Sequence, residues 1–166
     1  MIRAIFLDVD GTLISFSTHE IPASARRALT QAHERGVRLF IATGRAANDL
    51  GPLEGIPYDG VVSLNGARCV ANDGRVVSLH PIPRADFERA LALSEEQDFA
   101  MGLELEEGVF VNRVTPDVKR VAHMVAHPVP EQTDLRELFG RVECCQLCFY
   151  FDAETQRRGM AELPTL

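Results

Sequence analysis

The first 64 residues alternate strand-like and helix-like segments, and this alternation limits the fold more than any other feature of the chain. Short apolar runs without helical periodicity predict buried strands at 3–7, 37–42 and 60–64. Amphipathic segments at 21–36, where Gly36 is expected to cap the C-terminus, and at 46–53 predict helices between them. Strands that alternate with helices usually build a parallel sheet, so we expect a doubly wound α/β domain here.

The alternation stops after residue 66, where a hairpin is predicted. Two strand-like pieces, 67–71 and 75–79, flank Asn72-Asp73-Gly74, a sequence typical of a tight turn. The rest of the chain mixes helices, expected at 84–98, 115–127, 135–139 and from Asp152 onward, with strands, expected at 101–106, 109–113 and 142–151. We therefore predict an α/β unit at 1–80 and an α+β unit at 81–166.

Two carboxylates follow the first predicted strand, in the sequence Asp8-Val9-Asp10-Gly11-Thr12. Residues two apart on a strand project to the same side, so Asp8 and Asp10 repel each other unless a positive charge lies nearby. The next strand ends in Thr43-Gly44-Arg45, and the carboxyl ends of parallel strands meet at one edge of a sheet. Alone, Asp-x-Asp-Gly is more often only a turn. With the second group beside it, the set suits a phosphate and a hard cation such as Mg²⁺.

These motifs resemble those of the haloacid dehalogenase (HAD) superfamily. Residues 8–12 resemble its first motif, Thr43 its second, and the runs 41–45 and 63–67 resemble the Cof-type branch (subfamily IIB) of sugar-phosphate phosphatases. The resemblance implies a HAD-like Rossmannoid parallel-sheet core with an inserted α+β cap of the C2 type. Residues 1–80 would be the N-terminal half of this core, and 81–166 an incomplete cap.

The resemblance also implies a role for each motif residue. Asp8 would attack phosphorus to form an aspartyl-phosphate, and Asp10 would protonate the leaving alcohol and then activate water. Mg²⁺ would bind the Asp8 carboxylate and the Asp10 backbone carbonyl. The residues expected to bind phosphate or substrate are Gly11, Thr12, Thr43, Gly44, Arg45 and Asn65. The implied substrate is a small phosphorylated metabolite, in particular a sugar phosphate.

Two further motifs of the superfamily have no counterpart in the sequence: a lysine that holds the phosphate and an acidic G-D-x-x-N-D cluster that completes the metal site. The single lysine, Lys119, is predicted on a solvated helix face of the second unit. Asp152 lacks the glycine and the paired carboxylate and is expected to cap a helix. The chain is therefore expected to end within its cap and to be inactive alone. A catalytically inactive phosphate-binding module and a phosphotransferase or mutase stay open as alternatives.

Charge and hydropathy limit the partners. A formal net charge of -7 does not favour nucleic-acid binding, which needs clustered Lys and Arg. No apolar run reaches the roughly 20 residues that span a membrane, and no signal-peptide pattern is present, so a cytoplasmic location is expected.

In the superfamily, strands beyond this segment flank the strand that bears the nucleophile. The strand at 3–7 is therefore expected to be an exposed edge through which copies of the chain associate.

Two features of the second unit are predicted to be structural. Cys145 and Cys148 form a C-x-x-C, but no second pair stands at ligand spacing, so core packing is favoured over a zinc or redox role. Glu104 and Glu106 alternate with leucines and are interpreted as the solvated face of a strand.

Overall fold

The computed structural model describes residues 2–15, 17–18, 20–125 and 127–152, and the chain divides into two compact units, Met1–His80 and Pro81–Leu166. Each unit has its own sheet and its own hydrophobic core. The helix predicted from Asp152 onward falls on 153–166, outside the described residues.

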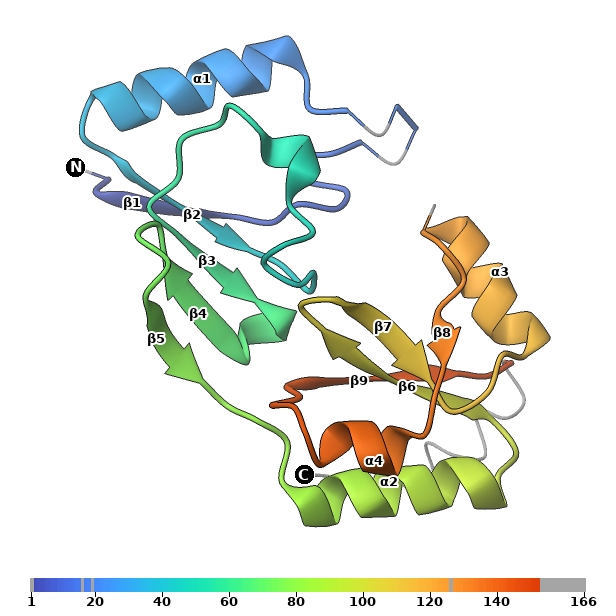
Figure 1. Cartoon of the computed structure of the whole chain (residues 1–166). Coiled ribbons are helices and arrows are strands. Elements are labelled where there is room, and N and C mark those ends of the chain that lie inside the picture. The colour runs from blue at the N-terminus through green and yellow to red at the C-terminus, as the bar shows by residue number, and fades with distance from the viewer. Residues whose placement is uncertain (1, 16, 19, 126, 153–166) are drawn as a thin grey trace. The chain divides into compact units, whose positions relative to one another are not determined.

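The first unit is built on a five-stranded sheet of order β1-β2-β3-β4-β5 (Figure 1). Its strands are β1 (Ala4–Leu7), β2 (Arg38–Ala42), β3 (Gly60–Ser63), β4 (Arg68–Ala71) and β5 (Val76–Leu79). The first three are parallel, and β4 and β5 add an antiparallel hairpin. The predicted α/β pattern of three parallel strands followed by a hairpin is thus confirmed.

Helix α1 (Ala23–Glu34) packs its apolar stripe on one face of this sheet. Leu29 of the helix joins a cluster that includes Leu39 and Ile41 of β2, both fully buried. Gly36 ends the helix with a φ of 81°, a conformation that side chains disfavour, so the predicted glycine cap is confirmed. The chain can then turn directly into β2.

The α-helix predicted at 46–53 is not formed. The segment contains turns and a single 3₁₀ turn, η1 (Gly51–Leu53). Pro52 has no backbone N–H, and Gly51 lowers helix propensity, so a regular helix cannot continue through this point. The prediction was wrong because it rested on the apolar spacing of the segment and gave too little weight to Gly51 and Pro52.

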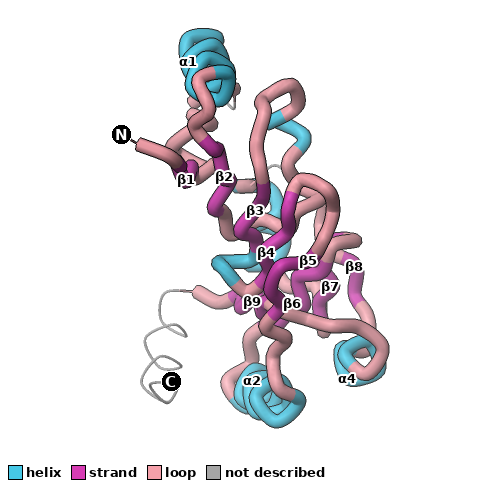
Figure 2. Tube along the Cα trace, turned by 90° about the vertical axis from the view of Figure 1, so that its left-hand side faces the viewer, coloured by secondary structure: helices cyan, strands magenta, loops and turns pink. Residues whose placement is uncertain are grey.

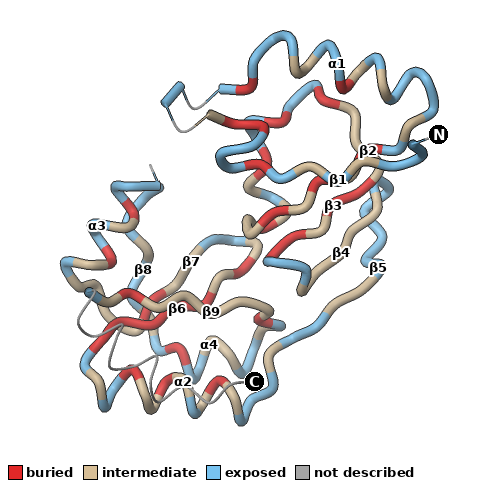
Figure 3. Tube along the Cα trace, turned by 180° about the vertical axis from the view of Figure 1, so that it is seen from behind, coloured by how far each residue is buried: buried red, intermediate tan, exposed pale blue. Residues whose placement is uncertain are grey.

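Strand β1 is an edge of the sheet among the described residues. Ile5 and Leu7 pack toward the core under α1, whereas Phe6 on the other face is 62% exposed and stacks on Phe40, with ring centroids 4.9 Å apart. Figure 3 shows β1 in tan and pale blue, without the red of buried residues. The strand is therefore covered on one face only.

The second unit contains a four-stranded sheet of order β8-β7-β6-β9, with its strands in magenta and its helices in cyan in Figure 2. Its elements are α2 (Arg84–Glu96), β6 (Ala100–Leu105), β7 (Gly108–Val111), α3 (Pro116–Met124), β8 (Glu131–Gln132), α4 (Leu135–Phe139) and β9 (Gln146–Tyr150). The two-residue strand β8 was not predicted, because Pro128 and Pro130 precede it closely and its pairing with β7 depends on a distant segment.

Helices pack on both faces of the second sheet, and each face has its own hydrophobic cluster. Side chains of α2 and α4 pack on one face, where Phe87 stacks on Phe139 with ring centroids 4.1 Å apart. Helix α3 packs on the other face, where Val118 contacts a cluster with Val111 and Tyr150. Alternate residues of a strand face opposite sides, so β6 contributes to both clusters.

Glu104 is half-buried, so its interpretation as a solvated residue was wrong. Gln146 lies opposite it on β9 and donates its amide to the Glu104 carboxylate at 2.5 Å. The Cys148 thiol donates to the same carboxylate oxygen at 3.5 Å. Only the pairing of β6 with β9, about 40 residues apart in the chain, brings these groups together.

Burial raises the pKa of the Cys148 thiol from 9.0 to about 12, and the Glu104 charge adds to this effect. The unfolded chain therefore ionises this thiol at a lower pH than the folded chain does. The stability that the neutral thiol contributes is complete below pH 9.0 and is lost as the pH rises toward about 12. We expect the free energy of unfolding to fall across this range, and to fall less steeply in Cys148→Ala.

Urea titrations on both sides of pH 9.0 measure this slope. Burial raises the pKa of Tyr150 as well, and that of Cys144 to about 11, so some slope remains in the variant. Cys69→Ala, in the first unit, is the control. An unchanged slope in Cys148→Ala would mean that folding does not shift the ionisation of this thiol.

Candidate active site at the carboxyl ends of β1 and β2

The segment after β1 forms a tight turn that turns two carboxylates outward. Val9 is buried, while Asp8 and Asp10 on either side of it are exposed. The Val9 carbonyl accepts hydrogen bonds from the amides of Thr12, Leu13 and Ile14. Gly11 has a φ of 79° and donates its amide to the Ile14 carbonyl at 2.8 Å. The turn therefore needs glycine at this position, and the buried Val9 anchors it.

Thr12 orients the first carboxylate of the motif. Its hydroxyl donates to Oδ2 of Asp8 at 2.9 Å. The carboxylate accepts this hydrogen bond through one oxygen, and the bond fixes the orientation of the Asp8 side chain. Contacts of Gly11 and Thr12 with a phosphate stay predictions.

The turn after β2 lies at the same end of the sheet, because β1 and β2 are parallel neighbours. Thr43 is buried, and its hydroxyl oxygen accepts a hydrogen bond from the backbone amide of Arg45 at 3.1 Å. Asn65, which follows β3, donates its backbone N–H to the Thr43 carbonyl at 3.2 Å. A Cβ added to Gly44 would lie 3.1 Å from the Asn65 side-chain oxygen, so glycine allows the two turns to approach closely.

Arg45 connects the two motifs directly. Its Nε donates to Oδ2 of Asp10 and its Nη2 donates to Oδ1, each at 2.8 Å. Its Nη1 donates to the side chain and to the carbonyl of Asp49, each at 3.2 Å. The hydrogen bonds that Arg45 donates to Asp10, together with the Asp49 charge and against the effect of burial, raise the pKa of Arg45 above its ordinary value. The sequence predicted a positive charge beside the two carboxylates. Arg45 supplies such a charge at Asp10.

Asp49 was not among the predicted site residues. Its position four residues after Arg45 was the available signal, since such pairs are neighbours on a helix. The segment forms a turn instead, in which the Asp49 amide donates to the Ala46 carbonyl at 3.1 Å. The second acidic partner of Arg45 thus comes from the segment where the helix prediction failed.

The residues present fit a hard divalent cation only as a partial site. The described part of the chain holds no group of three or more His, Cys, Asp or Glu side chains suited to a metal ion. Asp8 offers an exposed carboxylate, whereas both carboxylate oxygens of Asp10 are bound by Arg45. One carboxylate with a backbone carbonyl, water and phosphate oxygens is a common Mg²⁺ environment. Lys119 and Asp152 are both exposed residues of the second unit.

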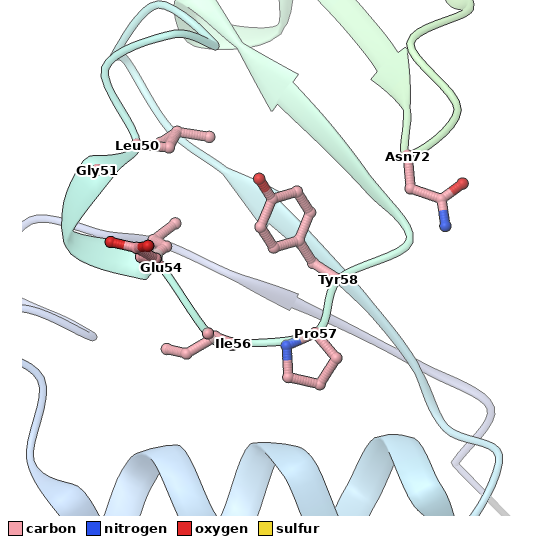
Figure 4. Close-up of a pocket in the computed structure, with 9 residues that line it drawn as sticks. Leu50, Gly51, Glu54, Ile56, Pro57, Tyr58 and Asn72 are labelled. Carbon is pink, nitrogen blue, oxygen red and sulfur yellow. The ribbon is translucent and has the colours of Figure 1, made fainter.

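The first unit also contains a cavity of about 550 Å³ that lies away from these carboxylates. It is lined by Leu50, Gly51, Leu53, Glu54, Gly55, Ile56, Pro57, Tyr58 and Asn72 (Figure 4). Tyr58 comes just before β3, whereas the motif residues follow the carboxyl ends of β1 and β2. A smaller hollow of about 390 Å³ is lined by Gly11 and Thr12 of the motif and by four residues that follow them. We place the candidate site by its chemistry, at the motif rather than in the larger cavity.

Residues 5–165 match the family model of haloacid dehalogenase-like hydrolases. The chain belongs to this family. The predicted resemblance is thereby confirmed over nearly the whole chain, and with it the predicted HAD-like α/β fold.

Solved structures of HAD phosphatases share the fold. BT1666 from Bacteroides thetaiotaomicron, described among the phosphatases of the HAD superfamily, is 53% identical with a TM-score of 0.91, and the match covers 98% of this chain and 61% of that one. BT4131, described as a HAD subclass IIB sugar phosphatase, is 28% identical with a TM-score of 0.81, covering 98% and 64%. The chain thus spans less than two thirds of either structure.

A Bacillus subtilis (strain 168) protein named as a phosphatase, YkrA, is 30% identical over 95 residues, which are 57% of this chain and 36% of that protein.

Within the described residues, no helix combines the length and hydropathy needed to cross a membrane.

Proposed function

We propose that this chain carries the phosphoryl-accepting half of a Mg²⁺-dependent phosphatase that hydrolyses a small phosphorylated metabolite, in particular a sugar phosphate. The observation that carries the proposal is the pairing of Asp10 with Arg45, which joins the two motifs at the carboxyl ends of β1 and β2. The likeness to BT4131, described as a sugar phosphatase, supports the substrate class. The activity belongs to the whole protein, in which the first unit would form the N-terminal half of the HAD core and the second would belong to the cap.

In the proposed reaction, Asp8 is the nucleophile. Its Oδ2 accepts the Thr12 hydroxyl, so Oδ1 is the oxygen expected to attack phosphorus. The new bond joins Oδ1 to phosphorus, and the bond from phosphorus to the substrate oxygen breaks. Protonated Asp10 gives its proton to the leaving oxygen, then takes a proton from the water that attacks the aspartyl-phosphate and releases orthophosphate.

The remaining site residues hold the substrate. Thr43 and Gly44 would bind the transferring phosphoryl group through a hydroxyl and a backbone amide, and Arg45 and Asn65 would face the substrate. Mg²⁺, held by the Asp8 carboxylate and the Asp10 backbone carbonyl, would neutralise charge as one anion attacks another. The sequence-based expectation of a cytoplasmic enzyme stays a prediction.

Metal binding gives a direct test on this chain. We expect weak Mg²⁺ binding that Asp8→Asn weakens further, because the substitution removes the carboxylate charge that the cation requires. Isothermal titration calorimetry measures it. Asp73→Asn, which removes an exposed carboxylate from the β4–β5 turn, is the matched control. Equal effects of the two substitutions would place the metal elsewhere.

Product analysis on the protein expressed from its complete gene separates the three candidate functions. A phosphatase releases orthophosphate from sugar phosphates, and a mutase or phosphotransferase returns the phosphoryl group on another sugar hydroxyl. A catalytically inactive binding module binds Mg²⁺ and phosphate but forms neither product. Only the first result supports the proposal.

Self-association of this chain through β1 is also proposed. The edge offers backbone donors and acceptors together with the exposed Phe6 and Ile2, and such edges recruit partner strands. We expect sedimentation to detect oligomers that Phe6→Lys converts to monomers. Val77→Lys places the same charge on an exposed residue of β5, at the opposite edge, and should leave the oligomers intact. A wild-type chain that stays monomeric at high concentration would refute this part of the proposal.

A further inference from the structure

Arg45 presents two different edges of one planar group. The edge formed by Nε and Nη2 binds both oxygens of Asp10, while Nη1 binds Asp49 through its carboxylate and its carbonyl. A guanidinium is rigid, so fixing Nη1 also fixes the direction of the other edge. The Arg45 side chain is 22% exposed, and Asp10 and Asp49 are 43% and 38% exposed, so solvent can reach both contacts.

The Asp10 carboxylate occupies the edge of Arg45 that would suit a phosphate. Two oxygens of a carboxylate and two oxygens of a phosphate both match the paired donors of this edge. A carboxylate that accepts two hydrogen bonds from a guanidinium uses both of its oxygens as acceptors. In this arrangement neither oxygen carries a proton that it could donate. For the proposed reaction, Asp10 must therefore leave Arg45 before it can protonate the leaving oxygen.

We propose that Asp49 is a positioning residue that keeps the Nε and Nη2 edge of Arg45 aimed at the site while a substrate phosphate replaces the Asp10 carboxylate on it. The inference rests on the proposed function. The exchange couples substrate arrival to the release of Asp10, since the same two donors serve both anions in turn. Asp49 stays bound to Nη1 throughout, so Arg45 does not lose its orientation when Asp10 departs.

The sign of one substitution separates this role from simple electrostatics. Removing a negative charge near an anion site should tighten anion binding if only charge matters. If Asp49 aims Arg45, Asp49→Ala should instead weaken the binding of inorganic phosphate, by about three- to tenfold, because Arg45 loses its fixed direction. Asp49→Asn keeps an acceptor oxygen and should recover part of the affinity.

NMR titration of this chain with inorganic phosphate in the presence of Mg²⁺ measures these affinities from the amide signals of Gly44 and Arg45. The Arg45 Nε–H signal, recorded without phosphate, reports the guanidinium directly and should exchange faster with water in Asp49→Ala. Asp73→Ala is the control for loss of one negative charge in the same unit. In an Arg45→Ala background, Asp49→Ala should cause no further weakening.

The outcomes distinguish the two proposals. Phosphate binding that tightens or stays unchanged in Asp49→Ala overturns the positioning role and leaves the proposed function standing. Wild-type chain that shows no phosphate response overturns the phosphate site, while a faster-exchanging Nε–H in Asp49→Ala still supports the hold of Asp49 on Arg45. Weakening that persists without Arg45 would mean that Asp49 acts on the site by another route.

Discussion

Asp8→Asn is expected to abolish orthophosphate release by the protein expressed from its complete gene, with kcat lowered by at least about a thousandfold. An amide has nearly the shape of the carboxylate and can still accept the Thr12 hydroxyl, so the turn after β1 should persist. It cannot attack phosphorus, and no aspartyl-phosphate can form. Steady-state assays with a sugar phosphate, and mass spectrometry of the acid-quenched enzyme, measure the two effects.

Asp10→Asn provides the comparison that isolates the nucleophile. With an aryl phosphate whose leaving group needs no proton, this variant should still form the aspartyl-phosphate and accumulate it, because the base that activates water is missing. Asp8→Asn should form none with any substrate. If Asp8→Asn keeps more than about a tenth of the wild-type rate, the nucleophile is a different residue.

Phe87→Ala is expected to lower the free energy of unfolding of the second unit by about 3–5 kcal/mol. Phe87 is fully buried between the sheet and α4, and it stacks on Phe139. Its removal leaves a cavity that the surrounding helices fill only in part. A loss of this size is a large fraction of the stability of a small domain.

The tyrosines allow the measurement on one unit at a time. The chain has no tryptophan and two tyrosines, Tyr58 in the first unit and Tyr150 in the second. In a Tyr58→Phe background, fluorescence during urea unfolding therefore reports the second unit alone. Val129→Ala, at a half-exposed position of the same unit, should cost less than about 1 kcal/mol. Equal losses from both substitutions would show that Phe87 is not central to this core.

The sequence alone determined the elements whose causes are local. Apolar runs located the three parallel strands of the first unit, because strands of a parallel sheet are rich in apolar residues. Gly11 and Gly36 marked turns whose backbone angles disfavour a side chain. Asp8 and Asp10 were recognised as site candidates because they stand two apart where a strand ends.

The tertiary structure decided what depends on residues distant in the chain. Parallel pairing of β1 with β2 brings Arg45 onto Asp10, 35 positions away, and the failed helix at 46–53 leaves a turn that places Asp49 on the other edge of the guanidinium. Pairing of β6 with β9 leaves Glu104 half-buried, although its alternation with leucines indicated a solvated face. A local pattern does not show which distant strands pair, and the pairing with its register fixes which polar groups meet.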